Sequence, residues 1–82
     1  MKTYKHYSDG GHGWLAVKRV ELEELEIAKK ISGYSYQRGK TVYLEEDCDM
    51  TTFIKAYQEK HNHEPKIEGV WDKGRIRSYN QY

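Results

Sequence analysis

The sequence predicts an α+β fold: a small antiparallel sheet of three to five strands, with two helices packed on one face. Several short runs alternate apolar and polar residues as half-buried strands do, and two other runs have the spacing of amphipathic helices. The chain has 82 residues, 37% of them hydrophobic, which suits one core of modest size. We therefore expect residues 1–82 to form a single small α+β domain with an extended C-terminal segment, 66–82.

Two strands are expected near the N-terminus. The run Lys2–Tyr7 is short, aromatic and alternating, and its charged residues disfavour burial on both faces, so we place it at an edge of the sheet. Residues 8–13 (SDGGHG) are rich in residues that tolerate positive φ and form a turn. The run 14–19 then reads as a second strand, with Leu15 and Val17 facing the core.

The first helix is expected from about Val20. Glutamates come early and lysines late in this segment, as the helix macrodipole favours. Ile27 lies off the apolar face, so either the apolar arc is wide or the helix loosens near Glu26. Gly33 is expected to follow the helix as a left-handed residue.

Two alternating runs meet at Gly39 and predict a hairpin over residues 34–44. Val42 and Leu44 form its aliphatic face. The second helix follows an acidic run at 45–49. Its apolar residues recur at the i, i+3, i+4, i+7 spacing, Asp47 or Asp49 is positioned to cap it, and it is expected to end near residues 60–61.

The last stretch has irregularly spaced apolar residues interrupted by glycines. Residues 75–79 alternate, so an extended conformation would place Arg75, Arg77 and Tyr79 on one face. Tyrosines and arginines also share a face of the predicted hairpin.

These tyrosines and arginines have two interpretations. Aromatic rings stack on nucleobases, and the arginine fork binds phosphate. Alternatively, the tyrosines complete a thin core as cross-strand pairs and the arginines pack on them through cation-π contacts. The first interpretation gives a ligand-binding set of His12, Trp14, Tyr34, Tyr36, Arg38, Tyr43, Arg75, Arg77 and Tyr79.

The glycine-rich loop at residues 8–13 is a turn or a ligand-contacting loop. Phosphate-binding loops lead into a helix and carry a lysine, whereas this loop leads into a strand and has none. His12 and Trp14 give it a polar tip and a stacking surface.

Catalytic and metal-binding patterns are weak. His61 and His63 could bind a metal together with Cys48, Asp47 or His6, but their spacing matches no strong zinc pattern. The aspartates beside Cys48 suppress its thiolate form. The acidic run 45–49 has three interpretations: it supplies helix-capping charge, forms a protein-docking patch or binds a divalent cation. We predict no catalytic residue, no metal site and no cofactor.

Charge and composition restrict the partners. The chain has 14 Lys and Arg against 13 Asp and Glu, a net charge of +1, which argues against coating nucleic acid through bulk electrostatics. The single cysteine fits a reducing cytosol. Because no run approaches the roughly 20 apolar residues of a membrane span and the start lacks a signal peptide, we expect a cytoplasmic protein without membrane contact.

Three motifs, YSDGGHGW, ISGYSYQRG and VYLEEDCD, resemble a group of small proteins encoded by tailed phages, prophages and related mobile elements. The resemblance spans residues 7–57, with an echo at 75–79. A glycine would suit such sequences better than Glu26. The group has no established activity, so the resemblance assigns no site. It implies an accessory protein that counters host defence, and hence a location in the host cell cytosol.

The leading hypothesis is therefore a non-enzymatic module that sequesters a small nucleotide-like ligand, with host immune signals among the candidates. A homodimer is expected because a chain of this size has little room for a deep pocket. The alternatives are an inhibitor that binds a host defence protein directly through exposed aromatic residues such as Trp71, a nucleic-acid-binding protein and a small hydrolase.

Overall fold

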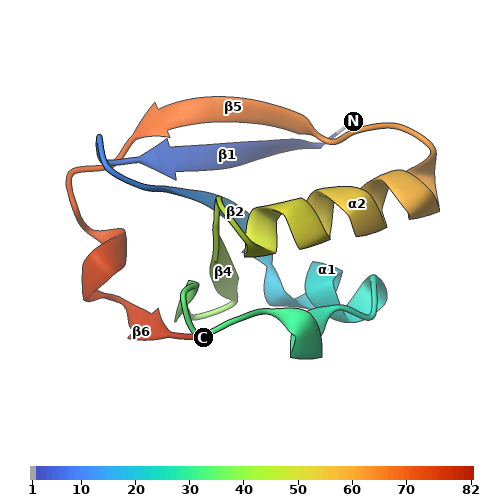
Figure 1. Cartoon of the computed structure of the whole chain (residues 1–82), viewed down its shortest axis with the longest axis horizontal. Helices are drawn as coiled ribbons and strands as arrows, with labels where there is room; N and C mark the ends of the chain where they lie inside the picture. The colour runs from blue at the N-terminus through green and yellow to red at the C-terminus, as the bar shows by residue number, and fades with distance from the viewer. Residues whose placement is uncertain (1) are drawn as a thin grey trace.

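The structure is a computed structural model that describes residues 2–82. Six strands form one mixed sheet in the order β5-β1-β2-β4-β3-β6 (Figure 1). The elements in chain order are β1 (Thr3–Ser8), β2 (Gly13–Lys18), α1 (Arg19–Glu24), the 3-10 turn η1 (Ala28–Lys30), β3 (Tyr36–Arg38), β4 (Thr41–Glu45), α2 (Asp49–His61), β5 (Lys66–Trp71), the 3-10 turn η2 (Ile76–Ser78) and β6 (Asn80–Gln81).

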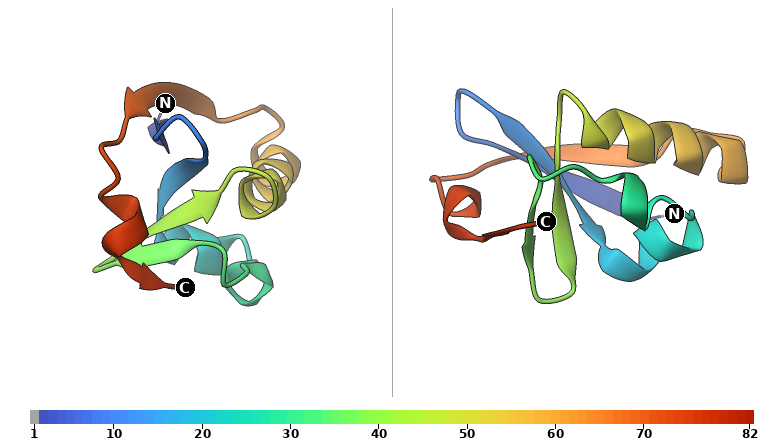
Figure 2. Two further views of the ribbon diagram at one scale, coloured as in Figure 1. Left: turned by 60° about the vertical axis from the view of Figure 1, so that its left-hand side comes forward. Right: turned by 60° about the horizontal axis from the view of Figure 1, so that its bottom comes forward.

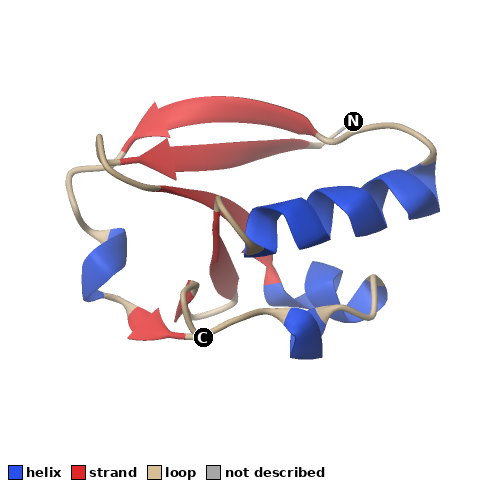
Figure 3. Cartoon of the chain, viewed as in Figure 1, coloured by secondary structure: helices blue, strands red, loops and turns tan. Residues whose placement is uncertain are grey.

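The strands between β1 and β6 pair antiparallel with their neighbours. β5 is the exception, because it returns after α2 and pairs in parallel with β1 over six residues. The sheet twists strongly, so that β1 and β5 lie at a steep angle to β3 and β4 (Figure 2). The long helix α2 runs alongside β1 and β5 (Figure 3).

The predicted fold class was wrong in two respects. The sheet has six strands and is mixed, where three to five antiparallel strands were expected. It is covered by one long helix, α2, and a short one, α1, where two full helices were expected. The extra strands come from residues 66–82. Edge strands alternate weakly in hydrophobicity and pair through backbone groups, so the irregular apolar spacing there did not reveal them.

The main core lies between the sheet and the helices. Leu15, Leu22, Val42, Leu44 and Phe53 are fully buried, and Val17 nearly so. Tyr4 joins this core from β1, where its ring packs edge-on against Phe53 at 5.2 Å between centroids. The aliphatic faces predicted for β2 and β4 are thus confirmed as core faces. Burial at this level is the main source of stability in a small domain.

The first helix loosens at Glu26, as one of the two sequence interpretations allowed. The N–H of Ile27 donates to Leu22 O at 2.9 Å, and the N–H of Glu26 donates to Glu23 O at 3.0 Å, which is the pattern of a Schellman C-terminus. Glu26 occupies the left-handed position with φ +60°. Glycine adopts that conformation without steric conflict, which explains why a glycine would suit this position.

Several local predictions were wrong. Lys2–Tyr7 was placed at an edge, but β1 lies between β2 and β5 because a strand from the other end of the chain covers it. Gly33 is not among the residues with positive φ. Neither predicted aspartate caps α2, which begins without a side-chain cap. None of the helices within residues 2–82 has the length and apolar character needed to cross a membrane.

Candidate functional site

The sheet face opposite α2 carries an aromatic surface formed by Tyr7, Trp14, Tyr36 and Tyr43, here called the aromatic face. Strand register places these side chains together, because Tyr7 is the cross-strand partner of Trp14, and Tyr36 is the partner of Tyr43. Ring centroids lie 6.0 Å apart in both the Tyr7–Tyr43 and Trp14–Tyr36 pairs. This face is not packed against the helices, which leaves it accessible to other contacts.

Residues 72–79 cover part of the aromatic face. Ile76, in η2, is 2% exposed and anchors this segment. Tyr79 adds a fifth ring, 5.2 Å from Tyr43 between centroids. Arg75 and Arg77 flank Ile76 in the chain, and each of them lines a separate hollow. The aromatic face is therefore divided into two candidate sites.

The first site, here called the indole hollow, has a volume of about 390 Å³. Three kinds of side chain line it: aromatic rings from β2, β3 and the turn before β3, basic groups from η2 and the glycine-rich loop, and acidic groups from the end of β4. The lining residues are His12, Trp14, Tyr34, Tyr36, Glu45, Asp47, Cys48 and Arg77.

A chain of contacts orders the basic side of the indole hollow. Arg77 Nε donates to Asp9 Oδ2 at 2.7 Å, and Arg77 Nη2 lies 2.8 Å from His12 Nδ1. The guanidinium carbon of Arg77 is 5.4 Å from the centroid of the Trp14 ring, a cation-π distance. In the free chain, Arg77 thus contacts an acidic partner, a histidine and an indole.

The carboxylate of Asp9 also holds the glycine-rich loop in shape. Its Oδ1 accepts from the N–H groups of Gly11 at 3.1 Å and His12 at 2.9 Å, as in an Asx turn. The Arg77 side chain and these N–H groups hold the pKa of Asp9 well below its usual value of 3.8. Asp9 in turn raises the pKa of Arg77. Both groups therefore stay charged at neutral pH.

The contact with Arg77 determines the tautomer of His12. Guanidinium nitrogens only donate hydrogen bonds, so Nδ1 of His12 acts as the acceptor. The neutral imidazole then carries its proton on Nε2. The ring stacks near Trp14, with 6.2 Å between centroids and 26° between planes. His12 thus offers a donor at the mouth of the hollow.

Trp14 is buried with its indole N–H unpaired among the described residues. It is 3% exposed, and among the described residues its indole Nε1 has no hydrogen-bond partner. An unpaired buried donor is uncommon and unfavourable in a folded protein. The side chains of His12 and Arg77 around it belong to exposed residues, so they can shift when a ligand with an acceptor enters.

A buried polar clamp supports the aromatic wall of the indole hollow. Asp49, which is 1% exposed, accepts from the backbone N–H of Ser32 at 3.0 Å and from the Ser32 hydroxyl at 2.6 Å. It also accepts from the hydroxyl of Ser35, whose oxygen accepts in turn from Glu45 N at 3.0 Å. The turn that carries Tyr34 and Tyr36 is thereby tied to α2 and β4.

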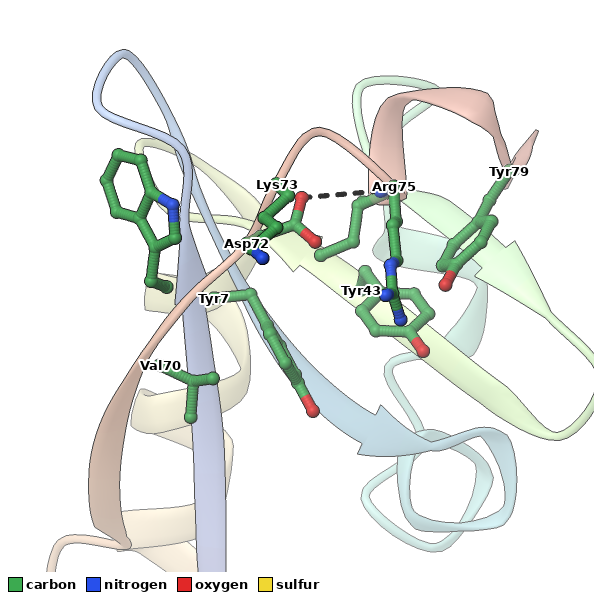
Figure 4. Close-up of a pocket in the computed structure, with 9 residues that line it drawn as sticks. Tyr7, Tyr43, Val70, Asp72, Lys73, Arg75 and Tyr79 are labelled. Atoms are coloured by element: carbon green, nitrogen blue, oxygen red, sulfur yellow. Dashed lines mark hydrogen bonds between the residues drawn. The ribbon is translucent and has the colours of Figure 1, made fainter.

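The second site, here called the tyrosine hollow, has a volume of about 310 Å³ (Figure 4). Tyrosine side chains enter it from β1, β4 and the C-terminal segment. Burial raises the pKa of Tyr43, with contributions from Tyr79 and Tyr7, so its hydroxyl stays protonated at neutral pH. The lining residues are Tyr7, Tyr43, Val70, Trp71, Asp72, Lys73, Arg75, Ile76 and Tyr79.

The cations of the tyrosine hollow are not neutralised by ion pairs. Within residues 2–82, neither Lys73 nor Arg75 forms a salt bridge. The nearby Asp72 is 6% exposed, and its Oδ2 accepts from Gly74 N at 3.1 Å. It also accepts from Ile76 N at 3.4 Å, the bond that is dashed in Figure 4. Asp72 therefore shapes the turn, while the two cations remain available to an anion.

The residues predicted to bind a ligand are distributed over both hollows. Arg38 lines neither of them and donates to the hydroxyl of Tyr79 at 3.3 Å. Arg75, Arg77 and Tyr79 would share one face in an extended segment, but this condition is not met because η2 is a 3-10 turn. The indole hollow contains His12, Trp14, Tyr34, Tyr36 and Arg77, and the tyrosine hollow contains Tyr43, Arg75 and Tyr79.

Sequence reasoning missed the residues that position the site. Asp9 was available as a signal, since an aspartate two residues before a glycine in a turn commonly binds the following N–H groups. Asp49 gave a misleading signal, because it follows an acidic run and resembled a helix cap. Its partners Ser32 and Ser35 are distant in sequence, and a contact between separate loops has no periodic pattern.

The metal-site alternative gains no geometric basis. No cluster of three potential ligands occurs anywhere in the described part of the chain. His61 and His63 instead lie against Tyr57, with centroid distances of 4.3 and 5.6 Å.

The chain matches no protein-family profile, and neither a curated protein nor a solved structure shows significant similarity to it.

Proposed function

We propose that this protein is a non-enzymatic binding module that sequesters a small nucleotide-like ligand, with the ring of the ligand seated in the indole hollow. The observation that carries the proposal is Trp14, which lines this aromatic hollow and whose buried indole N–H has no partner among residues 2–82. A heteroaromatic ring supplies both a surface for stacking and acceptor nitrogens or oxygens for such a donor.

The size and lining of the indole hollow support this assignment. A volume of about 390 Å³ lies within the usual range of small-molecule sites. Tyr34 is 74% exposed and is free to close over a bound ring. The carboxylates of Glu45 and Asp47 also line the hollow and can accept hydrogen bonds from amino or hydroxyl groups of a nucleoside.

We place the phosphate groups of such a ligand in the tyrosine hollow. Arg77 is already paired with Asp9 at 2.7 Å, so its charge is partly compensated. Lys73 and Arg75 lack such a pair among the described residues, and arginine binds phosphate with a planar fork. We expect a ligand with both a base and phosphates to bind more tightly than the corresponding nucleoside.

The resemblance to small proteins of phages and mobile elements supplies the biological context of the proposal. Sequestration of a host nucleotide signal would counter host defence from the host cytosol without any chemical step. Direct inhibition of a host defence protein is the competing proposal. It predicts binding to that protein and no binding to nucleotides.

The test is differential scanning fluorimetry of the purified chain with cyclic nucleotides, ADP-ribose and its derivatives. We expect at least one of these probes to raise the melting temperature, and heat denaturation to release it intact. No shift with any probe would overturn the proposal, and conversion of the probe would show an enzyme instead.

Matched variants of Tyr34 locate the site. Tyr34→Ala removes an exposed ring and should abolish most of the thermal shift while leaving the free protein equally stable. Tyr34→Phe retains the stacking surface and should keep the shift. If both variants bind as the parent chain does, the ligand is held elsewhere and the assignment to the indole hollow fails.

A further inference from the structure

The open edge of β5 is the most accessible backbone in the sheet. β5 is the terminal strand and pairs only with β1 among the described residues. Five of its six residues are exposed, including Ile67 at 40% and Trp71 at 65%. At the other end of the sheet, β6 has only two residues. Long uncovered edges are templates for pairing with another strand, and β5 is the long edge here.

One hydrogen bond shows which N–H and C=O groups of β5 point toward the open edge of the sheet. Asp72 N donates to Ser8 O at 2.7 Å, so the groups of Asp72 point toward β1. Successive residues of a strand point their N–H and C=O groups to alternate sides. The backbone groups of Ile67, Gly69 and Trp71 therefore face the open edge and are available to a partner strand.

The side chains of these three residues share one side of the sheet. Ile67 is the register partner of Tyr4, whose ring packs against Phe53 of α2. Ile67, Gly69 and Trp71 accordingly lie on the α2 side, since alternate residues share a face. No atom comes within 4 Å of the position of a Cβ at Gly69. The edge thus presents two apolar side chains, Ile67 and Trp71, which are separated by the open space at Gly69.

We propose that two copies of this chain pair through β5 as antiparallel strands about a two-fold axis at Gly69, forming one sheet continuous across a homodimer. In this register, Gly69 lies opposite the partner's Gly69, and Ile67 lies opposite the partner's Trp71. The Trp71 ring, which lies beside Gly10 of its own chain, then packs on the partner's isoleucine next to the open space at Gly69. The outward backbone groups form about six hydrogen bonds between the chains.

The neighbouring symmetric registers are less favourable. An axis at Glu68 brings the two Glu68 side chains directly opposite each other, where like charges repel. It also places Trp71 opposite Pro65, which has no N–H to donate. An axis at Ile67 places Gly69 opposite Pro65 and loses hydrogen bonds in the same way. Of these three registers, only the one at Gly69 uses every outward group from Ile67 to Trp71.

The partner strand in this proposal is β5 of a second copy of the chain. That strand carries the same residues and presents the same outward backbone groups. Isologous pairing makes each half-site complementary to itself and closes the assembly at two chains. Glu68 points to the other side of the sheet, and its register partner is Lys5, which offsets its charge. Trp71 lies in the chain between Val70 and Asp72, which line the tyrosine hollow, so the interface adjoins that site.

The first test is the mass of the purified chain in solution, measured by light scattering over a range of concentrations. We expect the parent chain to reach twice its monomer mass of 9.8 kDa. Ile67→Lys should remain at the monomer mass. Val20→Lys is the matched control, because Val20 is a 54% exposed apolar residue on α1, and this variant should dimerise as the parent does. A parent chain that stays monomeric, or loss of the dimer in the control alone, overturns the proposal.

The second test reports the register through single cysteines in a Cys48→Ser background. Opposed residues on antiparallel strands have Cα atoms about 5.5 Å apart, within disulfide range. Gly69→Cys should form a disulfide with its symmetry mate under mild oxidation, faster than Ile67→Cys or Glu68→Cys. Fastest cross-linking at residue 67 or 68 would contradict the Gly69 register, and equal slow rates at all three would contradict pairing through β5.

Discussion

The two faces of the sheet are built in different ways. On the helix-covered face, Leu15, Val42 and Leu44 are fully buried beneath α2. On the aromatic face, Trp14 and Ile76 are buried at 3% and 2% exposure, whereas the tyrosine rings are only partly buried. The first face is a completed core, and the second is a half-covered surface with two hollows. The first face therefore supplies most of the burial that stabilises the fold, and the second is the surface on which we place the proposed recognition.

The largest effect should come from the helix-covered face. Phe53→Ala removes a fully buried ring from the centre of the core and should reduce the free energy of unfolding by about 3–5 kcal/mol. Chemical denaturation monitored by circular dichroism measures this change. A loss below about 1 kcal/mol would mean that α2 is not the principal cover of the sheet.

A smaller loss of stability is expected on the aromatic face. Ile76→Ala should lower the free energy of unfolding by about 2 kcal/mol, the lower end for such a substitution, because η2 is short and its exposed neighbours can collapse toward the gap. It should also abolish ligand-induced thermal shifts, since Ile76 holds Arg75 and Arg77 in their separate hollows. If stability falls as far as in Phe53→Ala, the two faces are equivalent and the comparison fails.

The turn after α1 permits a stabilising change away from both hollows. Glu26→Gly should raise the free energy of unfolding by roughly 1 kcal/mol, because glycine adopts the φ of +60° at this position without conflict. Glu24→Gly, inside α1, is the control and should lower stability by up to about 1 kcal/mol. Equal effects of the two substitutions would contradict the left-handed conformation of Glu26.

The smallest effect is the pH dependence of the Asp9–Arg77 pair. The pKa of Asp9 is lowered in the folded chain, so its contribution to stability is present above its usual value of 3.8 and is lost as the pH falls further. Asp9→Asn keeps an acceptor for the loop N–H groups but removes the charge. Parent and variant should therefore differ in melting temperature at pH 7 and converge toward pH 2. A constant difference would show that the pair is unimportant.

The sequence predicted the locally encoded parts of this molecule well. The second helix, the hairpin around Gly39 and the aliphatic faces of β2 and β4 follow from periodicities within a few residues of one another, and the structure has each of them. The loosening of the first helix was one of two interpretations, and the left-handed Glu26 decided it.

The parts that the sequence did not reveal depend on distant contacts. β5 pairs with β1 across more than half of the chain, and no local pattern encodes that partner. The same holds for the candidate site. Its residue types were recognised from composition, but their division between two hollows depends on the 3-10 turn at Ile76 and on the ion pair of Arg77 with Asp9.

The most direct test of the account is the fluorescence of Trp14 during titration with nucleotides. The chain has two tryptophans, so the Trp71→Phe variant leaves Trp14 as the sole reporter of the indole hollow. We expect a saturable change in its emission with at least one cyclic nucleotide or ADP-ribose derivative, because the bound ring stacks beside the indole and engages its N–H. Unchanged emission with probes that nevertheless bind and stabilise the variant would contradict the assignment of the ligand to this hollow.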